Sequence, residues 1–157
     1  MKLPLVIAGL ALIASGCTQK KEADLSVQKK LIENHFKYLN AHDLKSLRTQ
    51  YSERAYVTAP EDQGAQPGPL GADQIFHRIF LTSSNMQYML SNVIVNDSSA
   101  FVRYEVRGSK TREAANTFFD YKGCSFFRIS NAKIDTEIMF ANPSKDISFM
   151  NGRMMMR

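Results

Sequence analysis

The feature that most constrains this fold is a long amphipathic helix pattern near the start of the chain. When residues 25–42 are placed at 100° per residue, the lysines, Glu33 and the asparagines gather on one side and most apolar residues on the other. The apolar side covers about half of the circumference, which is wider than the seam of a coiled coil. We therefore expect the helix to pack against something broad, such as a curved sheet. His35 and His42 fall within the apolar side.

The pattern changes from helices to strands along the rest of the chain. Asp43 is placed to cap a second helix that ends near Tyr51, and a third helix follows Gly71. Between these helices, residues 55–59 predict a strand, and residues 61–70, with their glycines and prolines, predict a loop. Alternating segments then predict strands at residues 85–95, 100–107, 117–129 and 133–140. This order predicts an α+β domain in which three N-terminal helices cover one face of an antiparallel sheet.

The first seventeen residues have the layout of a secretory signal peptide. Lys2 supplies a positive charge, and residues 3–13 form an apolar run that is too short to span a bilayer. The run ends in small residues before a cysteine, and this resembles the lipobox of bacterial lipoproteins: Leu12-Ile13-Ala14-Ser15-Gly16-Cys17. The resemblance implies that Cys17 becomes the first mature residue and carries fatty acyl chains such as palmitate. The alternative is an ordinary signal peptide cut near Gly16, which would leave a free thiol.

Composition divides the chain into four predicted segments. Residues 1–16 are the signal peptide, residues 17–23 are the lipidated Cys17 with a polar, flexible leash, residues 24–142 are the folded domain, and residues 143–157 are a tail. Thr18 stands where an Asp often retains lipoproteins at the inner membrane. We therefore predict a lipid-anchored protein of the bacterial cell envelope, in the outer membrane where the cell has two.

Charge and motifs exclude several classes of function. Twenty basic and 15 acidic residues give a net charge of +5 that is spread along the chain, so nucleic acid is not an expected partner. No glycine-rich phosphate loop is present, and the histidines at 35, 42 and 77 do not form a metal signature. The methionine-rich tail invites a Cu(I) interpretation, but no His or Cys accompanies the methionines. We predict no cofactor and no metal.

The ordered set of short motifs resembles the nuclear-transport-factor-2-like superfamily, particularly its SnoaL-like and ketosteroid-isomerase-like branches. The resemblance covers about residues 25–142 and depends on these segments: Asn40-Ala41-His42-Asp43, Ala55-Tyr56-Val57, Gly71, Asn96-Asp97 before Ala100, and Phe127-Arg128-Ile129 before Lys133-Ile134. It implies a cone in which a strongly bent sheet wraps the long helix and leaves an apolar pocket open at one end. Such pockets host isomerases, cyclases and dehydratases, and they also bind ligands or partners without chemistry.

The resemblance implies that the usual catalytic groups are missing. The position of the proton-shuttling base is Ala59, before Pro60, and an acidic residue often found on the last strand is replaced by Met139. In the ketosteroid-isomerase-like branch, two side chains donate hydrogen bonds to the oxyanion that forms on the substrate. The matching positions here are His35 and Ser125, and both side chains can still donate a hydrogen bond.

Two hypotheses for function follow. The favoured one is an apolar pocket that binds a small molecule or a protein partner without catalysis, and a homodimer stays open. The alternative is an isomerase, cyclase or dehydratase that uses His35 with Tyr56 or the displaced base Glu61. Each of these residues can also have a purely structural role. His35 would then be a core histidine, Tyr56 a strand tyrosine and Glu61 a solvated loop carboxylate. The predicted pocket residues are Ile32, His35, Phe36, Leu39, Tyr56, Tyr104, Tyr121 and Ser125.

Overall fold

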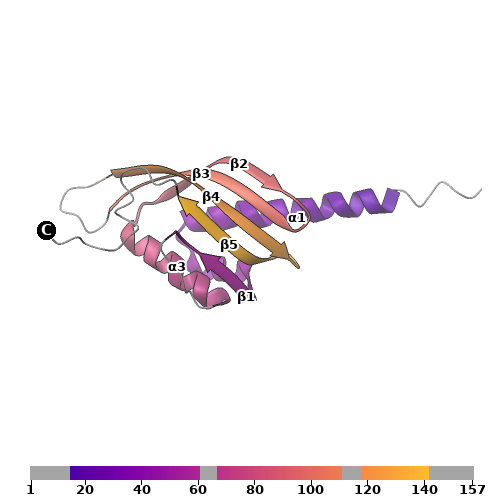
Figure 1. Cartoon of the computed structure of the whole chain (residues 1–157), viewed down its shortest axis with the longest axis horizontal. Helices are drawn as coiled ribbons and strands as arrows, with labels where there is room; N and C mark the ends of the chain where they lie inside the picture. The colour runs from indigo at the N-terminus through magenta and orange to yellow at the C-terminus, as the bar shows by residue number, and fades with distance from the viewer. Residues whose placement is uncertain (1–14, 61–66, 111–117, 142–157) are drawn as a thin grey trace, which may run out of the picture.

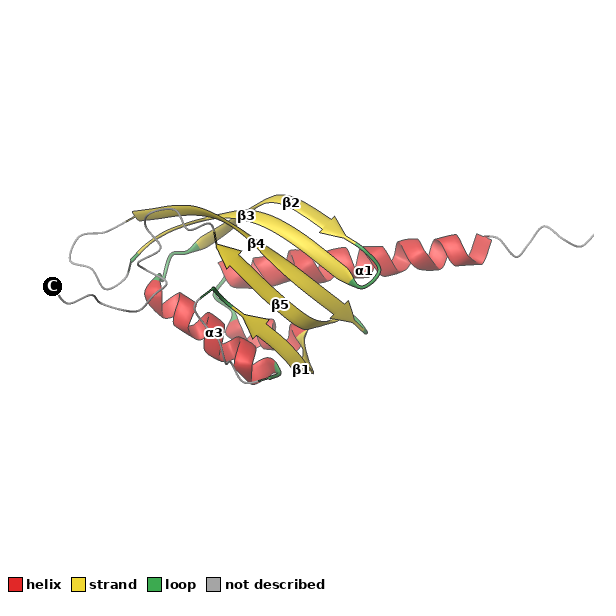
Figure 2. Ribbon diagram, in the orientation of Figure 1, coloured by secondary structure: helices red, strands yellow, loops and turns green. Residues whose placement is uncertain are grey.

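The computed structural model describes residues 15–60, 67–110 and 118–141. This part of the chain forms three helices and five strands, and the last four strands follow one another without a helix between them. Figure 2 shows the helices in red and the strands in yellow. Their order is α1 (Ser15–Asn40), α2 (Leu44–Gln50), β1 (Tyr51–Thr58), α3 (Pro69–Thr82), β2 (Gln87–Val95), β3 (Ser99–Ser109), β4 (Phe118–Ser130) and β5 (Lys133–Ala141). The predicted α+β class, with helices ahead of most of the sheet, is confirmed.

The five strands form one sheet in the order β1-β5-β4-β3-β2. The β2–β3, β3–β4 and β4–β5 pairs are antiparallel, as the sequence predicted. The β1–β5 pair is parallel, so the sheet is mixed. A parallel pair needs a long crossover connection, and here α3 with the strands β2 to β4 provides it.

The sheet curves around α1, and α3 packs against its β1 end (Figure 1). The first helix, α1, buries Ile32, His35, Phe36 and Leu39 against the concave face of the sheet. Inward residues alternate along β4, where Tyr121, Ser125, Phe127 and Ile129 are buried between exposed neighbours. The cone that the resemblance implied is therefore present, and most of its interior is filled by side chains.

The first helix is longer than the sequence predicted. It begins at Ser15, and residues 17–23, which were predicted to be a flexible leash, are helical in this structure. No Gly or Pro follows Gly16 within the helix, and its lysines, glutamines and Ala23 are good helix formers. The packed part of α1 supplies the nucleus from which such a segment can extend. No helix in the described part of the chain is long and apolar enough to cross a membrane.

Local caps explain where the shorter elements begin. Asp43 accepts a hydrogen bond from the Ser46 backbone N–H at 3.0 Å, and the bonds from Ser46 lower the pKa of the Asp43 carboxyl. Gly68 has φ +84° just before α3, and a Cβ there would lie 2.6 Å from the Glu53 carbonyl oxygen. Only glycine fits this approach without strain.

The first helix also closes the edge of the sheet. The Asn40 side chain accepts a hydrogen bond from the Tyr88 backbone N–H at 2.7 Å and donates one to the Tyr88 carbonyl at 2.9 Å. The C-terminal end of α1 therefore lies at the start of β2. At the other end of β2, Gln28 of α1 donates a hydrogen bond to the Asp97 carbonyl in the β2–β3 turn.

Candidate functional site

Four polar side chains meet in the core on one side of α1, and we call this group the floor: His35, Gln50, Tyr51 and Glu137. They come from α1, α2, β1 and β5. His35 is 0% exposed and Glu137 is 1% exposed, so both are removed from water. Buried ionisable groups of this kind require partners, because an isolated charge in the core is costly.

The hydrogen bonds of the floor fix the orientation of His35. The Gln50 amide N–H donates to the Leu31 carbonyl at 3.1 Å, so the Gln50 oxygen is the atom that faces His35 Nδ1, at 3.2 Å. His35 Nδ1 therefore carries a hydrogen and donates it. His35 Nε2 lies 3.5 Å from Glu137 Oε1, while the Tyr51 hydroxyl donates to the other Glu137 oxygen. The imidazole is thus hydrogen-bonded to the Gln50 amide through Nδ1, while Nε2 faces the Glu137 carboxylate without a hydrogen bond to any described residue.

Sequence reasoning missed Glu137, because it looked for an acidic residue at Met139 and found none. The β4–β5 pairing shifts register between Arg128 and Ile129, so that both Ile134 and Glu137 are buried although they are three residues apart. Such a shift hides the usual alternation in the sequence. The signal that was available is that Glu137 shares strand parity with Met139, which the resemblance had already placed inside the cone.

A small cavity lies between α3 and the sheet, and we call it the mouth. Its inner wall is formed by Tyr88, Tyr104, Tyr121, Met139 and Ile79, and its rim by Pro60, Phe140 and Ala141. It encloses about 10 Å³, which is room for about one water molecule. The Tyr88 and Tyr104 rings meet edge to face with centroids 5.4 Å apart, and the Tyr104 hydroxyl lies 3.2 Å from Ser125 Oγ.

Gly123 makes room for one wall of the mouth. A Cβ at this position would lie 2.6 Å from Cε2 of Tyr104 and 2.9 Å from the Phe140 carbonyl oxygen. The Tyr104 ring therefore lies directly over the glycine backbone of β4. A close approach of this kind is possible only where the strand has no side chain.

Burial controls the charge of the tyrosines. Burial is the main cause that raises the pKa of Tyr51 and Tyr88 well above its usual value, and the nearby Glu137 raises the pKa further. Burial also raises the pKa of Tyr104, although its bond to Ser125 acts in the opposite direction. All three phenols are consequently neutral at physiological pH, and they offer hydroxyl groups instead of charge.

The predicted pocket residues are divided between the floor, the mouth and the outer surface. Tyr104 and Tyr121 line the mouth. Ser125 is buried behind the Tyr104 hydroxyl. His35 lies in the filled core among the rings of Phe36, Phe76 and Phe127, whose centroids are 5.3 to 5.8 Å from its own. The other predicted helix residues, Ile32 and Leu39, are buried in the same core and do not line the cavity.

The prediction for Tyr56 is wrong. Its side chain is 48% exposed, because Ala55 and Val57 are the β1 residues that face the core. Tyr56 therefore cannot serve as a pocket or catalytic residue in this arrangement. Glu61 lies outside the described residues. Ala59 is half-buried beside Pro60, so the matching base position holds no acid.

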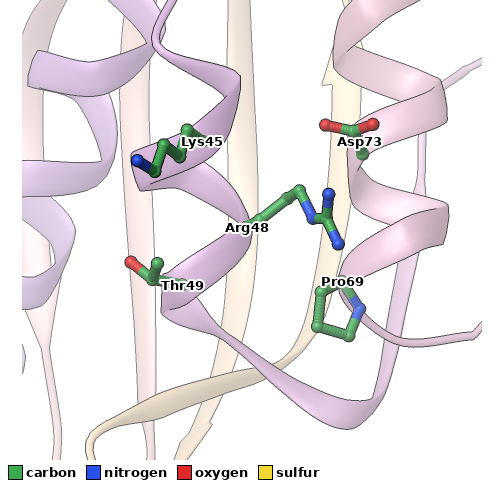
Figure 3. A pocket seen from close by; sticks show the side chains of 5 residues that line it. All are labelled: Lys45, Arg48, Thr49, Pro69 and Asp73. Carbon is green, nitrogen blue, oxygen red and sulfur yellow. The ribbon is translucent and has the colours of Figure 1, made fainter.

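A larger groove lies outside the cone, between α2 and α3, with a volume of about 490 Å³. Arg48 reaches from α2 toward α3, where Asp73 and Pro69 lie (Figure 3). Its other lining residues are Lys45 and Thr49, and none of the five is buried. Because small-molecule sites combine an apolar enclosure with a few fixed polar groups, the mouth and not this groove is the better candidate site.

Comparison with known proteins supports the same fold. The chain superposes on a candidate SnoaL-like polyketide cyclase from Jannaschia sp. CCS1, with TM-score 0.70, 12% identity and coverage of 82% of this chain and 94% of that one. It also resembles a candidate polyketide cyclase from Xanthomonas campestris pv. campestris, with TM-score 0.68, 14% identity and coverage of 76% and 93%. A third similar structure is an NTF2-like protein of unknown function from Exiguobacterium sp. 255-15, with TM-score 0.61, 15% identity and coverage of 73% and 99%.

These structural likenesses, at such low identity, concern the fold alone. Among curated proteins none matches this chain. The family model of the SnoaL-like domain matches residues 32–136, which include α2, α3, the strands β1 to β4 and the first part of β5. The match includes His35 and ends one residue before Glu137. This match spans most of the chain, and the protein therefore belongs to the SnoaL-like domain family.

Proposed function

We propose that this protein is a lipoprotein of the bacterial cell envelope whose mouth binds one small, neutral, mainly apolar molecule without changing it. The observation that carries this proposal is the chemistry of the cavity wall. Three tyrosines and Met139 line it, while His35 and Glu137 lie in the packed floor and do not border the cavity. A wall of aromatic faces with a few polar tips is typical of small-molecule sites.

The wall limits the class of ligand. Ring faces and Met139 favour a flat or branched apolar skeleton, and the neutral hydroxyls of Tyr88 and Tyr104 suit one or two ligand oxygens. An anion would be disfavoured, because Glu137 is close enough to raise the pKa of both tyrosines and would repel a second negative charge. The cavity as it stands is too small for such a ligand, so binding requires side chains to move, and the flexible Met139 is the one best suited to do so.

The proposed anchor depends on the sequence of the N-terminus. A signal peptide over residues 1–16 followed by Cys17 supports lipidation, and several acyl chains on one cysteine give stable anchoring. We expect Cys17→Ala to move the protein from the detergent-extracted membrane fraction to a soluble or unprocessed pool. A processed Cys17→Ala protein that still requires detergent would contradict the anchor. The proposed partners are thus the membrane and the ligand, and a homodimer remains a prediction.

Ligand binding can be tested with 2-naphthol, a flat apolar probe that carries one oxygen. We expect its fluorescence to change saturably with wild-type protein and the Ala141→Leu variant to weaken binding at least tenfold, because Ala141 lies on the rim. Thr136→Leu is the matched control, since Thr136 lies on β5 away from the cavity and pairs with Tyr56 and Arg128. Equal binding by all three proteins would contradict the proposed site. Mass spectrometry of molecules that copurify with the protein would then identify the natural ligand.

A second candidate function is favoured by one observation, the approach of His35 Nε2 to Glu137 at 3.5 Å. An imidazole and a carboxylate at this separation can transfer a proton, and two of the similar structures are described as candidate cyclases. The alternative is therefore an isomerase, cyclase or dehydratase acting on a small oxygenated substrate. If the wild type converts its copurified ligand while Glu137→Gln binds it unchanged, the enzyme hypothesis replaces the binding hypothesis.

A further inference from the structure

The direction of α1 relates the mouth to the proposed anchor. Asn40, at the C-terminal end of the helix, bonds to Tyr88, which lines the mouth. His42 follows the helix, and its ring stacks on Phe80 of α3 with centroids 4.2 Å apart, beside the lining residue Ile79. The mouth therefore lies at the C-terminal end of α1.

The N-terminal part of α1 leaves the sheet at the opposite end. Gln28 bonds to the β2–β3 turn, which is the end of the sheet farthest from Tyr88 along β2. From there the helix continues past the turn and beyond the sheet, as Figure 1 shows. The helix rise places residue 17 about 16 Å beyond Gln28 and about 35 Å from Asn40.

We infer that α1 is a stalk that holds the mouth on the side of the domain away from the membrane, so that the site exchanges its ligand with the aqueous phase and not with the bilayer. This inference rests on the proposed lipidation of Cys17. The segment 18–23 is polar in sequence and has no apolar stripe, so it does not have the pattern of a helix that lies in the membrane interface. A helix without that pattern has no apolar face that would lay the domain on the lipid.

Energy transfer to labelled lipid headgroups tests the orientation. The full chain is expressed with its signal, purified in lipidated form and placed in vesicles that carry an acceptor dye on the headgroups. In a Cys124→Ala background, a donor dye is attached either at Leu81→Cys, an exposed position of α3 near the mouth, or at Ser98→Cys, in the exposed β2–β3 turn. Thermal melting of each variant verifies its fold before labelling.

We expect weaker transfer from position 81 than from position 98, with the two donors at heights that differ by about 18 Å, which is the rise of the helix between Gln28 and Asn40. Equal transfer, or stronger transfer from position 81, would overturn the inference. Vesicle flotation separates the two proposals: protein that fails to float contradicts the lipid anchor itself, whereas protein that floats with its mouth near the lipid contradicts only the orientation.

Paired substitutions in the stalk test whether the helix maintains this height. Lys20→Gly with Lys21→Gly weakens the helix, whereas Lys20→Ala with Lys21→Ala removes the same charges and keeps helix propensity. We expect the glycine pair to increase transfer from position 81 and the alanine pair to leave it unchanged. If both pairs behave like the parent protein, α1 is not the stalk; if both increase transfer, the lysine charges and not the helix set the height.

Discussion

The floor and the mouth of the cone both contain buried tyrosines, but only the floor holds a buried imidazole beside a carboxylate. In the floor, Gln50 and Tyr51 hold the two sides of the His35–Glu137 pair, and aromatic rings fill the space around it. In the mouth, Tyr88 and Tyr104 surround a small void beside the flexible Met139. Floor residues are therefore expected to determine stability, whereas mouth residues are expected to determine what binds.

The difference follows from the cost of burying polar groups. A carboxylate and an imidazole away from water must have partners, so each element that meets at the floor supplies one. A neutral phenol is far less costly to bury, because most of its surface is apolar. Tyrosines can consequently line a site that is empty at one time and occupied at another.

The largest effect is expected from Glu137→Ala. The change leaves the Tyr51 hydroxyl without its acceptor, removes the carboxylate that His35 Nε2 faces, and should lower the free energy of unfolding by about 3–5 kcal/mol. Chemical denaturation measures this loss. Glu137→Gln is the matched control, because its carbonyl can accept from Tyr51 while its N–H group donates to Nε2. A loss as large for Gln as for Ala would contradict the orientation assigned to His35.

High pH is expected to destabilise floor and mouth together. The pKa of Tyr51, Tyr88 and Tyr104 is raised in the folded protein, so above pH 10 the unfolded chain releases protons that the folded chain retains. Stability is then complete below pH 10 and falls above it, by up to about 1.4 kcal/mol per tyrosine for each pH unit. Melting curves between pH 9 and pH 11.5, with tyrosinate absorbance, measure the fall. In Tyr88→Phe the fall should be shallower by about one third, and an unchanged slope would show that Tyr88 does not contribute.

A smaller effect, concentrated at the mouth, is expected from Gly123→Ala. The added methyl group displaces the Tyr104 ring, so we expect a loss of about 1–3 kcal/mol and weaker binding of 2-naphthol. Calorimetry and the probe titration measure the two effects. Tyr104→Leu in the same background removes the clashing ring, and stability that does not recover would place the strain elsewhere.

The smallest effect is expected from Tyr56→Ser, on the outer face of β1. Its side chain is exposed, so the free energy of unfolding should change by less than about 0.5 kcal/mol, and probe binding should stay the same. Binding that weakens with this change would restore Tyr56 to the site and remove the contrast between interior and surface.

The sequence predicted the fold better than the site. The wide apolar side of residues 25–42 and the alternation of Val102, Tyr104 and Val106 follow simple periodicities. The structure buries the three β3 residues and most of the centre of that helix side, but Val27 of the same side is 51% exposed. The prediction for Tyr56 failed because alternation in a strand separates two faces without showing which one is buried, and here Ala55 and Val57 face the core while Tyr56 faces outward. The parallel β1–β5 pair could not be predicted, since pairing between distant strands leaves no local pattern.

The part of the site that the sequence did not predict depends on contacts between segments far apart in the chain. Nothing near Gln50 in the sequence indicates that its amide fixes a histidine fifteen residues earlier. Glu137 was hidden by the register shift of β5. The filled state of the cone was also unpredictable, because it depends on how the rings of Phe36, Phe76 and Phe127 interlock around His35.

The Asn40 side chain at the edge of the sheet has a consequence for self-association. By accepting from the Tyr88 N–H and donating to its carbonyl, Asn40 occupies the backbone groups that an extended segment of another chain would use to add to β2. Edge strands with free backbone groups are templates for aggregation, so this contact opposes the pairing of two copies through β2. Asn40 thus protects the edge at the one point where β2 passes the mouth, and it does so with two hydrogen bonds from a single residue.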